Sequence, residues 1–402
     1  MLRKSIYQTV MERLDYDKDM SDLEIYELID DVIVMQSKVF AIGIAERGQL
    51  KKDIFYAIRK LDVLQQFIDN PDITEIMVNG KDHIFIEEKG AIREAKCSLI
   101  SEEKLNNLIM QIVSKCNRRV NESSPIVDAR LEDGSRVNVV MSPVSIDGSV
   151  ITIRKFPKSP ITMDRLIQIS SITKEAVNFL QKLVVAGYNV FISGGTGSGK
   201  TTFLNALSGF IPSDERIITI EDSAELQLLG VPNLVRLETR NQNAEGCSEI
   251  TIRDLIKTSL KMRPDRIIVG EVRGGEALDL LQCLNTGHDG SMSTGHANSA
   301  TDMLSRLETM VLMGMDLPIE AVRRQIASGI DILIHLGRLR DRSRKVLQIM
   351  EVLEFKDGEI MLNTLFEFEE MGEDEKGNVA GTLRKKSELA HKEKLMAAGI
   401  IS

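Results

Sequence analysis

The sequence predicts an α/β protein in which a parallel sheet covered by helices follows a smaller α+β domain and an N-terminal helical module. Short apolar segments alternate with helical segments beyond residue 173, and this alternation is typical of a parallel sheet. Between residues 61 and 155, strand patterns joined by turn residues predict antiparallel hairpins around one helix. Residues 1–60 carry apolar positions at helical spacing.

The helical module is expected over residues 1–60. Ser21-Asp22-Leu23-Glu24 has the form of a capping box, in which the serine and glutamate side chains satisfy the first turn of a helix. Apolar residues then follow at helical spacing, at Ile25, Leu28, Ile29 and Val32.

The α+β domain is expected over residues 61–155. A helix over residues 61–69 should stop before Asn70-Pro71, because proline disfavours helical geometry in the residue before it. Ser101 is expected to cap a second helix, whose apolar face packs on the sheet. The strands are expected over 73–78 and 83–87, on both sides of a turn at 132–135, and over 149–154.

A linker is expected over residues 156–162, because Pro157 and Pro160 block a continuous helix or central strand. The α/β domain then covers residues 163–402. Its strands are expected over 189–193, 217–220, 266–269 and 291–294, before a β-meander with strands over 330–335 and 346–355. Residues 371–384 are polar and are expected to form a mobile tail.

The first chemical motif is G-x-x-x-x-G-K-[ST], between an apolar strand and a helix. Its glycines let successive backbone N–H groups face a phosphate, while Lys200 reaches the β and γ phosphates and Thr201 offers its hydroxyl to Mg²⁺. A dinucleotide-binding turn has no use for Lys-Thr at this place. The predicted nucleotide-binding residues are Gly194, Gly195, Thr196, Gly197, Ser198, Gly199, Lys200, Thr201 and Thr202.

Two acidic segments are expected at the same edge of the sheet. Glu271 follows the strand over residues 266–269, where Gly270 replaces the usual aspartate, so Glu271 is expected to act on Mg²⁺ through water. Glu221 and Glu225 follow the strand over residues 217–220, at the edge where open α/β sheets bind ligands. A solvated acidic turn is an equal alternative for Glu225.

A histidine follows another predicted strand, in Ser293-Thr294-Gly295-His296-Ala297-Asn298. An isolated histidine is more often structural than catalytic. His288 and His296 are two of five histidines and lie near predicted sheet ends, which favours contact between His296 and a γ-phosphate.

Composition excludes several classes of protein. The chain has 402 residues, 43% hydrophobic and 28% charged, so it is globular, with two or three domains. Its four cysteines are widely spaced and form no metal or redox motif. No signal peptide and no membrane span are visible, so we expect a cytoplasmic protein that reaches a membrane through partners. The net charge of −9 argues against broad binding of nucleic acid.

The segments GGTGSGKTT, TIEDSAEL, RPDRIIVGEVRGGEALD and NTGHDGSMSTGHANS, in this order, resemble four motifs of the secretion ATPase superfamily of type II and type IV secretion systems: the Walker A motif, Asp box, Walker B motif and His box. Within this superfamily the chain is most similar to the CpaF-type tight-adherence pilus ATPases. The similarity covers nearly the whole chain, including DARLEDGSRVN, ITIRKF, LVRLETR and SRLETMVLMGMDLP.

The resemblance implies a RecA-like domain that hydrolyses ATP with Mg²⁺. It also implies a homo-hexamer that works with inner-membrane platform proteins at the cytoplasmic face and drives pilus assembly or protein secretion. Direct contact with nucleic acid is not expected.

The resemblance also implies roles for individual residues. Glu221 and Glu271 are placed around the attacking water, and His296 on the γ-phosphate. Arg130, Arg136 and Arg154 of the smaller domain become candidates for contacting nucleotide, and Arg236 and Arg240 for reaching a neighbouring site. A linker over residues 156–162 spans no more than about 25 Å, so we expect Arg136 to serve its own chain and Arg240 a neighbour.

Three other functions use a P-loop and are alternatives to this one. A GTPase is disfavoured because no N-K-x-D tetrapeptide follows the P-loop. A RecA-like ATPase that translocates nucleic acid stays open, although the chain is 4% aromatic and has no Trp for base stacking. An ATP-binding switch with negligible turnover is the third alternative.

Overall fold

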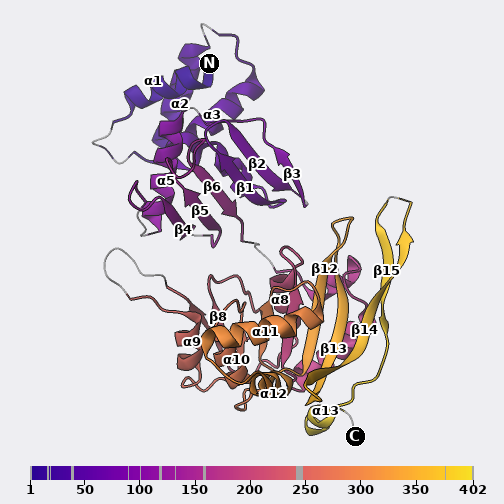
Figure 1. Cartoon of the computed structure of the whole chain (residues 1–402). Coiled ribbons are helices and arrows are strands. Elements are labelled where there is room, and N and C mark those ends of the chain that lie inside the picture. Colours follow the sequence, from indigo (N-terminus) through magenta and orange to yellow (C-terminus); the bar gives the residue numbers. More distant parts are fainter. Residues whose placement is uncertain are drawn as a thin grey trace. The chain divides into compact units, whose positions relative to one another are not determined.

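The computed structural model describes residues 2–15, 18, 20–37, 40–88, 90–99, 101–116, 120–131, 133–156, 160–240, 248–375 and 377–400. The chain divides into two compact units, Met1–Lys158 and Ser159–Ser402. Figure 1 shows that both units contain helices and a sheet. Within the described residues, no helix is long and apolar enough to cross a membrane.

The N-terminal unit begins with three helices that share one apolar cluster. They are α1 (Leu2–Arg13), α2 (Asp22–Gln36) and α3 (Ile44–Arg59). The predicted capping box is confirmed: the Ser21 hydroxyl accepts from the Glu24 backbone N–H, and the Glu24 carboxylate accepts from the Ser21 N–H. Buried apolar residues of all three helices, among them Ile6, Ile29 and Ile54, form the cluster.

A six-stranded antiparallel sheet follows, in the order β3-β2-β1-β6-β5-β4. Its strands are β1 (Ile73–Asn79), β2 (His83–Glu88), β3 (Ala91–Glu94), β4 (Ile126–Arg130), β5 (Arg136–Val140) and β6 (Val150–Arg154). Helix α5 (Glu102–Lys115) packs its apolar residues on the sheet, and Ser101 caps it as predicted. Strand β3 was missed because all four of its residues are exposed.

The helix predicted over residues 61–69 is wrong as a single element. The structure has a 3₁₀ turn, η1 (Asp62–Leu64), followed by the short helix α4 (Gln65–Asp69). The backbone of Asp62 has a φ of 50°, which a continuous right-handed helix does not allow.

The C-terminal unit has a nine-stranded sheet in the order β15-β14-β13-β12-β7-β11-β10-β8-β9. The strands from β12 to β9 pair in parallel, and β12 to β15 pair in antiparallel. Their bounds are β7 (Val190–Gly194), β8 (Ile217–Glu221), β9 (Leu234–Glu238), β10 (Arg266–Val269), β11 (Met292–Gly295), β12 (Ile332–Arg338), β13 (Arg344–Lys356), β14 (Glu359–Glu373) and β15 (Val379–Lys385). The predicted parallel strands and meander are confirmed.

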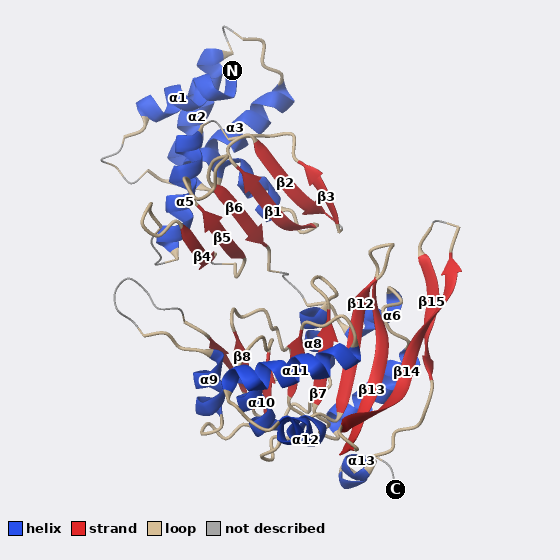
Figure 2. Ribbon diagram, in the orientation of Figure 1, coloured by secondary structure: helices blue, strands red, loops and turns tan. Residues whose placement is uncertain are grey.

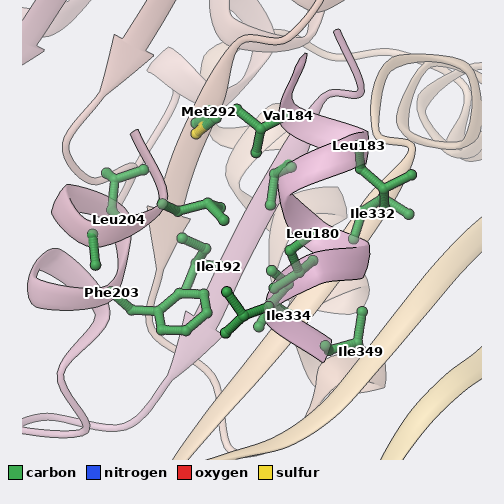
Figure 3. Packing of buried hydrophobic residues seen from close by; sticks show 14 of the residues in the cluster. Leu180, Leu183, Val184, Ile192, Phe203, Leu204, Met292, Ile332, Ile334 and Ile349 are labelled. Atoms are coloured by element: carbon green, nitrogen blue, oxygen red, sulfur yellow. The ribbon is translucent and has the colours of Figure 1, made fainter. Parts of the chain in front are cut away.

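Helices cover both faces of this sheet, as Figure 2 shows. They are α6 (Met163–Gln168), α7 (Lys174–Val185), α8 (Lys200–Ser208), α9 (Ile252–Ser259), α10 (Glu276–Leu284), α11 (Ala300–Gly314), α12 (Ile319–Gly329) and the short α13 (Glu393–Ala397). In Figure 3, Leu180 of α7 and Phe203 of α8 pack with Ile192 of β7 and Ile334 of β12. Helices α9 to α12 share the second cluster with the opposite side of the same strands.

The mobile tail predicted over residues 371–384 is wrong where the structure describes it. These residues contribute to β14 and β15, which pair with each other. Charged side chains at both ends of this range form ion pairs with neighbouring residues: Glu373 with Arg340 at 2.7 Å and Arg384 with Glu369 at 2.9 Å. The low hydrophobicity of residues 371–384 suggested mobility, but these polar residues form part of a solvated hairpin. The centre of the predicted linker, residues 157–159, lies outside the described residues.

Candidate functional site

The P-loop joins the buried strand β7 to helix α8. Gly197 and Gly199 have φ values of 71° and 94°, so the chain can turn there and start the helix at Lys200. A Cβ atom on Gly194 would lie 2.5 Å from the Leu336 carbonyl oxygen of β12, which requires glycine at the end of the strand. The turn therefore directs backbone N–H groups and the α8 N-terminus toward one place.

Lys200 lies against this turn and is nearly buried, with 7% of its surface exposed. Its Nζ atom donates to the carbonyl oxygens of Gly194 and Gly195, at 3.1 and 3.2 Å. It also lies 3.2 Å from Nδ1 of His296. An ammonium group can only donate, so Nδ1 of His296 accepts and its proton is on Nε2.

His296 connects Lys200 to Glu271. Its Nε2 atom lies 2.7 Å from Oε1 of Glu271, and Oε2 of Glu271 accepts two hydrogen bonds from the Arg273 guanidinium, at 2.9 and 2.6 Å. Burial lowers the pKa of His296; the charge of Glu271 opposes this, while Lys200 and Arg273 add to it. The ring is therefore neutral at pH 7, as the contact with Lys200 requires. Arg273 was not predicted, although it stands two residues after Glu271.

Glu221 ends strand β8 and is 3% exposed. Its Oε1 atom accepts from the backbone N–H groups of Glu225 and Leu226, at 2.8 and 2.9 Å. Its Oε2 atom has no hydrogen-bond partner among the described residues. Burial raises the pKa of Glu221 to about 7, although the two N–H groups and Arg236 oppose the shift. The carboxylate can therefore exchange a proton near neutral pH.

Gly270 makes room for Glu221. The two residues follow paired positions of β10 and β8, and a Cβ atom on Gly270 would lie 2.9 Å from Cγ of Glu221. Real Cβ atoms do not approach this closely, so a side chain at position 270 would displace the buried carboxylate. This explains in physical terms why glycine stands where an aspartate is usual.

These residues fit a triphosphate with Mg²⁺. The Ser198 hydroxyl oxygen is buried without a partner among the described residues, as is Oε2 of Glu221, so both can bind groups that the chain does not supply. Thr201 is half-buried in the first turn of α8, where its hydroxyl could bind Mg²⁺, and Thr202 follows it. Among the described residues there is no cluster of three His, Cys, Asp or Glu side chains that would hold a metal ion by itself.

His335, which sequence reasoning missed, lies behind the P-loop. It is 6% exposed on β12, directly opposite Ser193 of β7, and its Nδ1 atom lies 2.9 Å from the Ser193 hydroxyl oxygen. The ring also hydrogen-bonds to the backbone of Asn298, two residues after His296. Burial lowers the pKa of His335, so the neutral ring can accept from Ser193 and donate to Asn298. It connects the P-loop strand to the loop that carries His296.

Replacing His335 by leucine should therefore lower kcat more than it changes KM, because Ser193 and Asn298 lose their common partner and the His296 loop is no longer held. We expect about 1–3 kcal/mol lower stability in urea unfolding. His335→Gln should retain both properties, since glutamine can accept and donate. The exposed His83 gives a control, His83→Leu. Equal kcat values in His335→Leu, His335→Gln and the wild type would contradict this role.

A pocket of about 480 Å³ opens beside the P-loop. Gly195, Thr196 and residues 296–298 line one part of it, and residues of α11, including Arg306, line the rest. The pocket thus joins the P-loop and His296 to one side of α11.

The candidate arginines lie in both units. In the N-terminal unit, Arg130, Arg136 and Arg154 are direct neighbours across β4, β5 and β6. In the C-terminal unit, Arg236 is exposed on β9, and the exposed Arg240 donates to the Ser248 carbonyl oxygen at 3.1 Å. The structure therefore brings Lys200, Glu271 and His296 into direct contact but does not include Arg240 in that group.

Comparisons with known proteins point to secretion systems. The family described as Type II/IV secretion system protein matches residues 58–378. The type IV secretion system protein PtlH of Bordetella pertussis is 32% identical over 324 residues, 74% of this chain and 94% of PtlH. The type IV secretion system protein VirB11 of Brucella suis is 33% identical over 303 residues, 69% of this chain and 84% of VirB11.

Solved structures are similar as well. The pilus retraction motor PilT with bound ADP matches with a TM-score of 0.53 at 18% identity, over 82% of this chain and 83% of PilT. The Legionella pneumophila ATPase DotB matches with a TM-score of 0.50 at 20% identity, over 73% of this chain and 80% of DotB. At these identities the likeness shows the fold, and it confirms the predicted RecA-like α/β class.

Proposed function

Because the chain belongs to the type II/IV secretion system protein family, we propose that it is a Mg²⁺-dependent ATP hydrolase whose turnover drives pilus assembly or protein secretion. One observation carries the proposal: Lys200 of the P-loop is connected through His296 to Glu271, beside the phosphate-binding turn. A protein that only binds nucleotide has no need of this arrangement.

Each residue then has a task in hydrolysis. The P-loop N–H groups and Lys200 hold the triphosphate. The Thr201 hydroxyl would hold Mg²⁺, with Glu271 reaching the ion through water, and the ion would supply positive charge to the phosphates. The oxygen of water bonds to the γ-phosphorus, the bond to the bridging oxygen breaks, and ADP keeps that electron pair. We propose that Glu221 takes the proton of the water, because its free Oε2 atom and its pKa of about 7 suit a general base.

Arginines are proposed to complete the site. The adjacent Arg130, Arg136 and Arg154 form a row of positive charge that suits phosphate oxygens. We propose that Arg136 and Arg154 serve the nucleotide of their own chain, and that Arg240 reaches the site of a neighbour in a homo-hexamer. Its exposed position supports the second role.

We further propose that the chain is a CpaF-type tight-adherence pilus ATPase, on the sequence motifs given above. It would work at the cytoplasmic face of the inner membrane, bound to platform proteins. We also keep the division into residues 1–60, 61–155 and 163–402 with a linker over 156–162. The separate apolar clusters of the first two segments support it.

The proposal is tested by ATPase assays on the purified chain. Hydrolysis should require Mg²⁺, should be unchanged by single-stranded DNA, and should fall on dilution together with large oligomers in size-exclusion chromatography. Contacts supplied by an arginine of another subunit can contribute on the order of 10³ to 10⁵ in rate. Mixing Lys200→Ala with Arg240→Ala subunits should therefore restore part of the activity, whereas mixing Lys200→Ala with Arg136→Ala should restore none.

Other results would support the alternatives. Stimulation by single-stranded DNA would indicate a nucleic-acid translocase, and binding of ATP without turnover would indicate a switch. Constant specific activity in a verified monomer would overturn the dependence on assembly. With subunit exchange confirmed, rescue in the second mixture would show that Arg136 does not act within its own chain.

A further inference from the structure

One helix lines the pocket beside the P-loop with polar side chains at regular spacing. Asp302, Ser305, Arg306 and Thr309 of α11 face the pocket, three or four residues apart, so they lie on one side of the helix. The opposite side is buried: Met303, Leu304, Leu307, Met310 and Val311 belong to the hydrophobic core. The polar side of α11 and the P-loop residues Gly195 and Thr196 therefore line the same space.

Arg306 brings a positive charge to this pocket that the chain does not neutralise. Among the described residues it makes no hydrogen bond and no ion pair. Asp302, one turn earlier, lines the pocket too but forms no ion pair with it, although this spacing allows one. The charge of Arg306 contributes to the lowered pKa of His296, so the two side chains influence each other.

Lys200 and Arg306 differ in what they can bind. Lys200 is nearly buried, held by two P-loop carbonyl groups and by His296, where a P-loop lysine meets the β and γ phosphates. Arg306 is exposed and lines the pocket together with His296, and its planar guanidinium can bind two oxygens of one phosphate. An anion at Arg306 would be held by a side chain other than the P-loop lysine, in the pocket that His296 also lines.

We propose that Arg306 and the α11 side of this pocket form a subsite for inorganic phosphate, the second product of ATP cleavage. The proposal rests on the proposed ATP hydrolysis and names the residue that receives the product. Inorganic phosphate carries between one and two negative charges near neutral pH, which Arg306 attracts and Asp302 repels. Release of phosphate then depends on the balance between these two side chains.

The subsite is tested by equilibrium dialysis of radiolabelled inorganic phosphate against the full chain with MgADP. Arg306→Gln should weaken phosphate binding about tenfold or more, since one charge-assisted contact is lost, while ADP affinity stays unchanged. Asp302→Asn should strengthen binding. Arg324→Gln, which changes an exposed arginine of α12 outside the pocket lining, should have no effect. Inhibition of ATP hydrolysis by phosphate should likewise become weaker in Arg306→Gln, become stronger in Asp302→Asn and stay unchanged in Arg324→Gln.

Equal phosphate affinity in Arg306→Gln and the wild type would overturn the subsite, as would an equal loss of ADP affinity, which would place the guanidinium on the nucleotide. The outcomes are separate from those of the proposed function, because dialysis needs no turnover. If the chain showed no ATPase activity but still bound phosphate through Arg306, the proposed function would be refuted and the phosphate subsite would be supported.

Discussion

Replacing Lys200 by alanine is expected to lower ATP hydrolysis by about 10³-fold or more. The ammonium group is the positive charge inside the P-loop turn, and it is also the partner of Nδ1 of His296. Its loss removes the attraction for the β and γ phosphates and releases the ring that faces Glu271. Both effects act on the transferred phosphoryl group.

The measurement is steady-state hydrolysis with saturating MgATP, beside thermal unfolding to verify the fold. Lys261→Ala gives a matched control, because Lys261 is exposed just after α9 and does not line the pocket. Activity near the wild-type value in a folded Lys200→Ala protein would show that the P-loop is not the site of hydrolysis.

Replacing Glu221 by glutamine is expected to lower kcat by about 10²- to 10⁴-fold with little change in nucleotide binding, because a general base is lost. In the wild type, kcat should fall as pH decreases below about 7, where the buried carboxylate takes up a proton. Glu271→Gln should also keep nucleotide binding and lose turnover, but its residual activity should keep this pH dependence. The residual activity of Glu221→Gln should not depend on pH in this range.

Stability gives an independent measure of the same carboxylate. Burial raises the pKa of Glu221 in the folded chain from 4.5 to about 7, so the folded state favours the protonated form. The wild type should therefore lose stability relative to Glu221→Gln as pH rises from about 5 to 8. A stability difference that is independent of pH, or a pH profile retained in Glu221→Gln, would show that another group titrates.

Local pattern was enough to predict the P-loop, the parallel strands and the acidic residues that end them. Each of these features is contiguous in sequence and follows from turn chemistry or from the burial of a short strand. Strand β9 was not predicted, because none of its residues is fully buried. The hairpin of β14 and β15 was missed for a similar reason: most of its residues beyond Phe368 are exposed or half-buried, and its charged side chains form ion pairs at the surface, such as Arg384 with Glu369.

Contacts between distant segments could not be predicted. Ser193 and His335 are 142 positions apart, and they meet because β12 pairs with β7, an order that no local pattern shows. Arg306 was equally hidden, since its spacing on α11 is that of any amphipathic helix. The pairing of Lys200 with His296 was anticipated as a shared γ-phosphate site, but their direct contact at 3.2 Å depends on β7 and β11 being neighbours.

The close approach of Gly270 to Glu221 restricts how this site can change by mutation. With 2.9 Å between a Cβ atom at position 270 and Cγ of Glu221, the two positions compete for one volume. An aspartate after β10 could be accepted if position 221 had first become smaller, and Glu221 is accepted while position 270 is glycine. The order of substitutions therefore matters. A change from Glu221 with Gly270 to a small residue at 221 with an aspartate at 270 passes through a sequence that has neither the glutamate nor the aspartate.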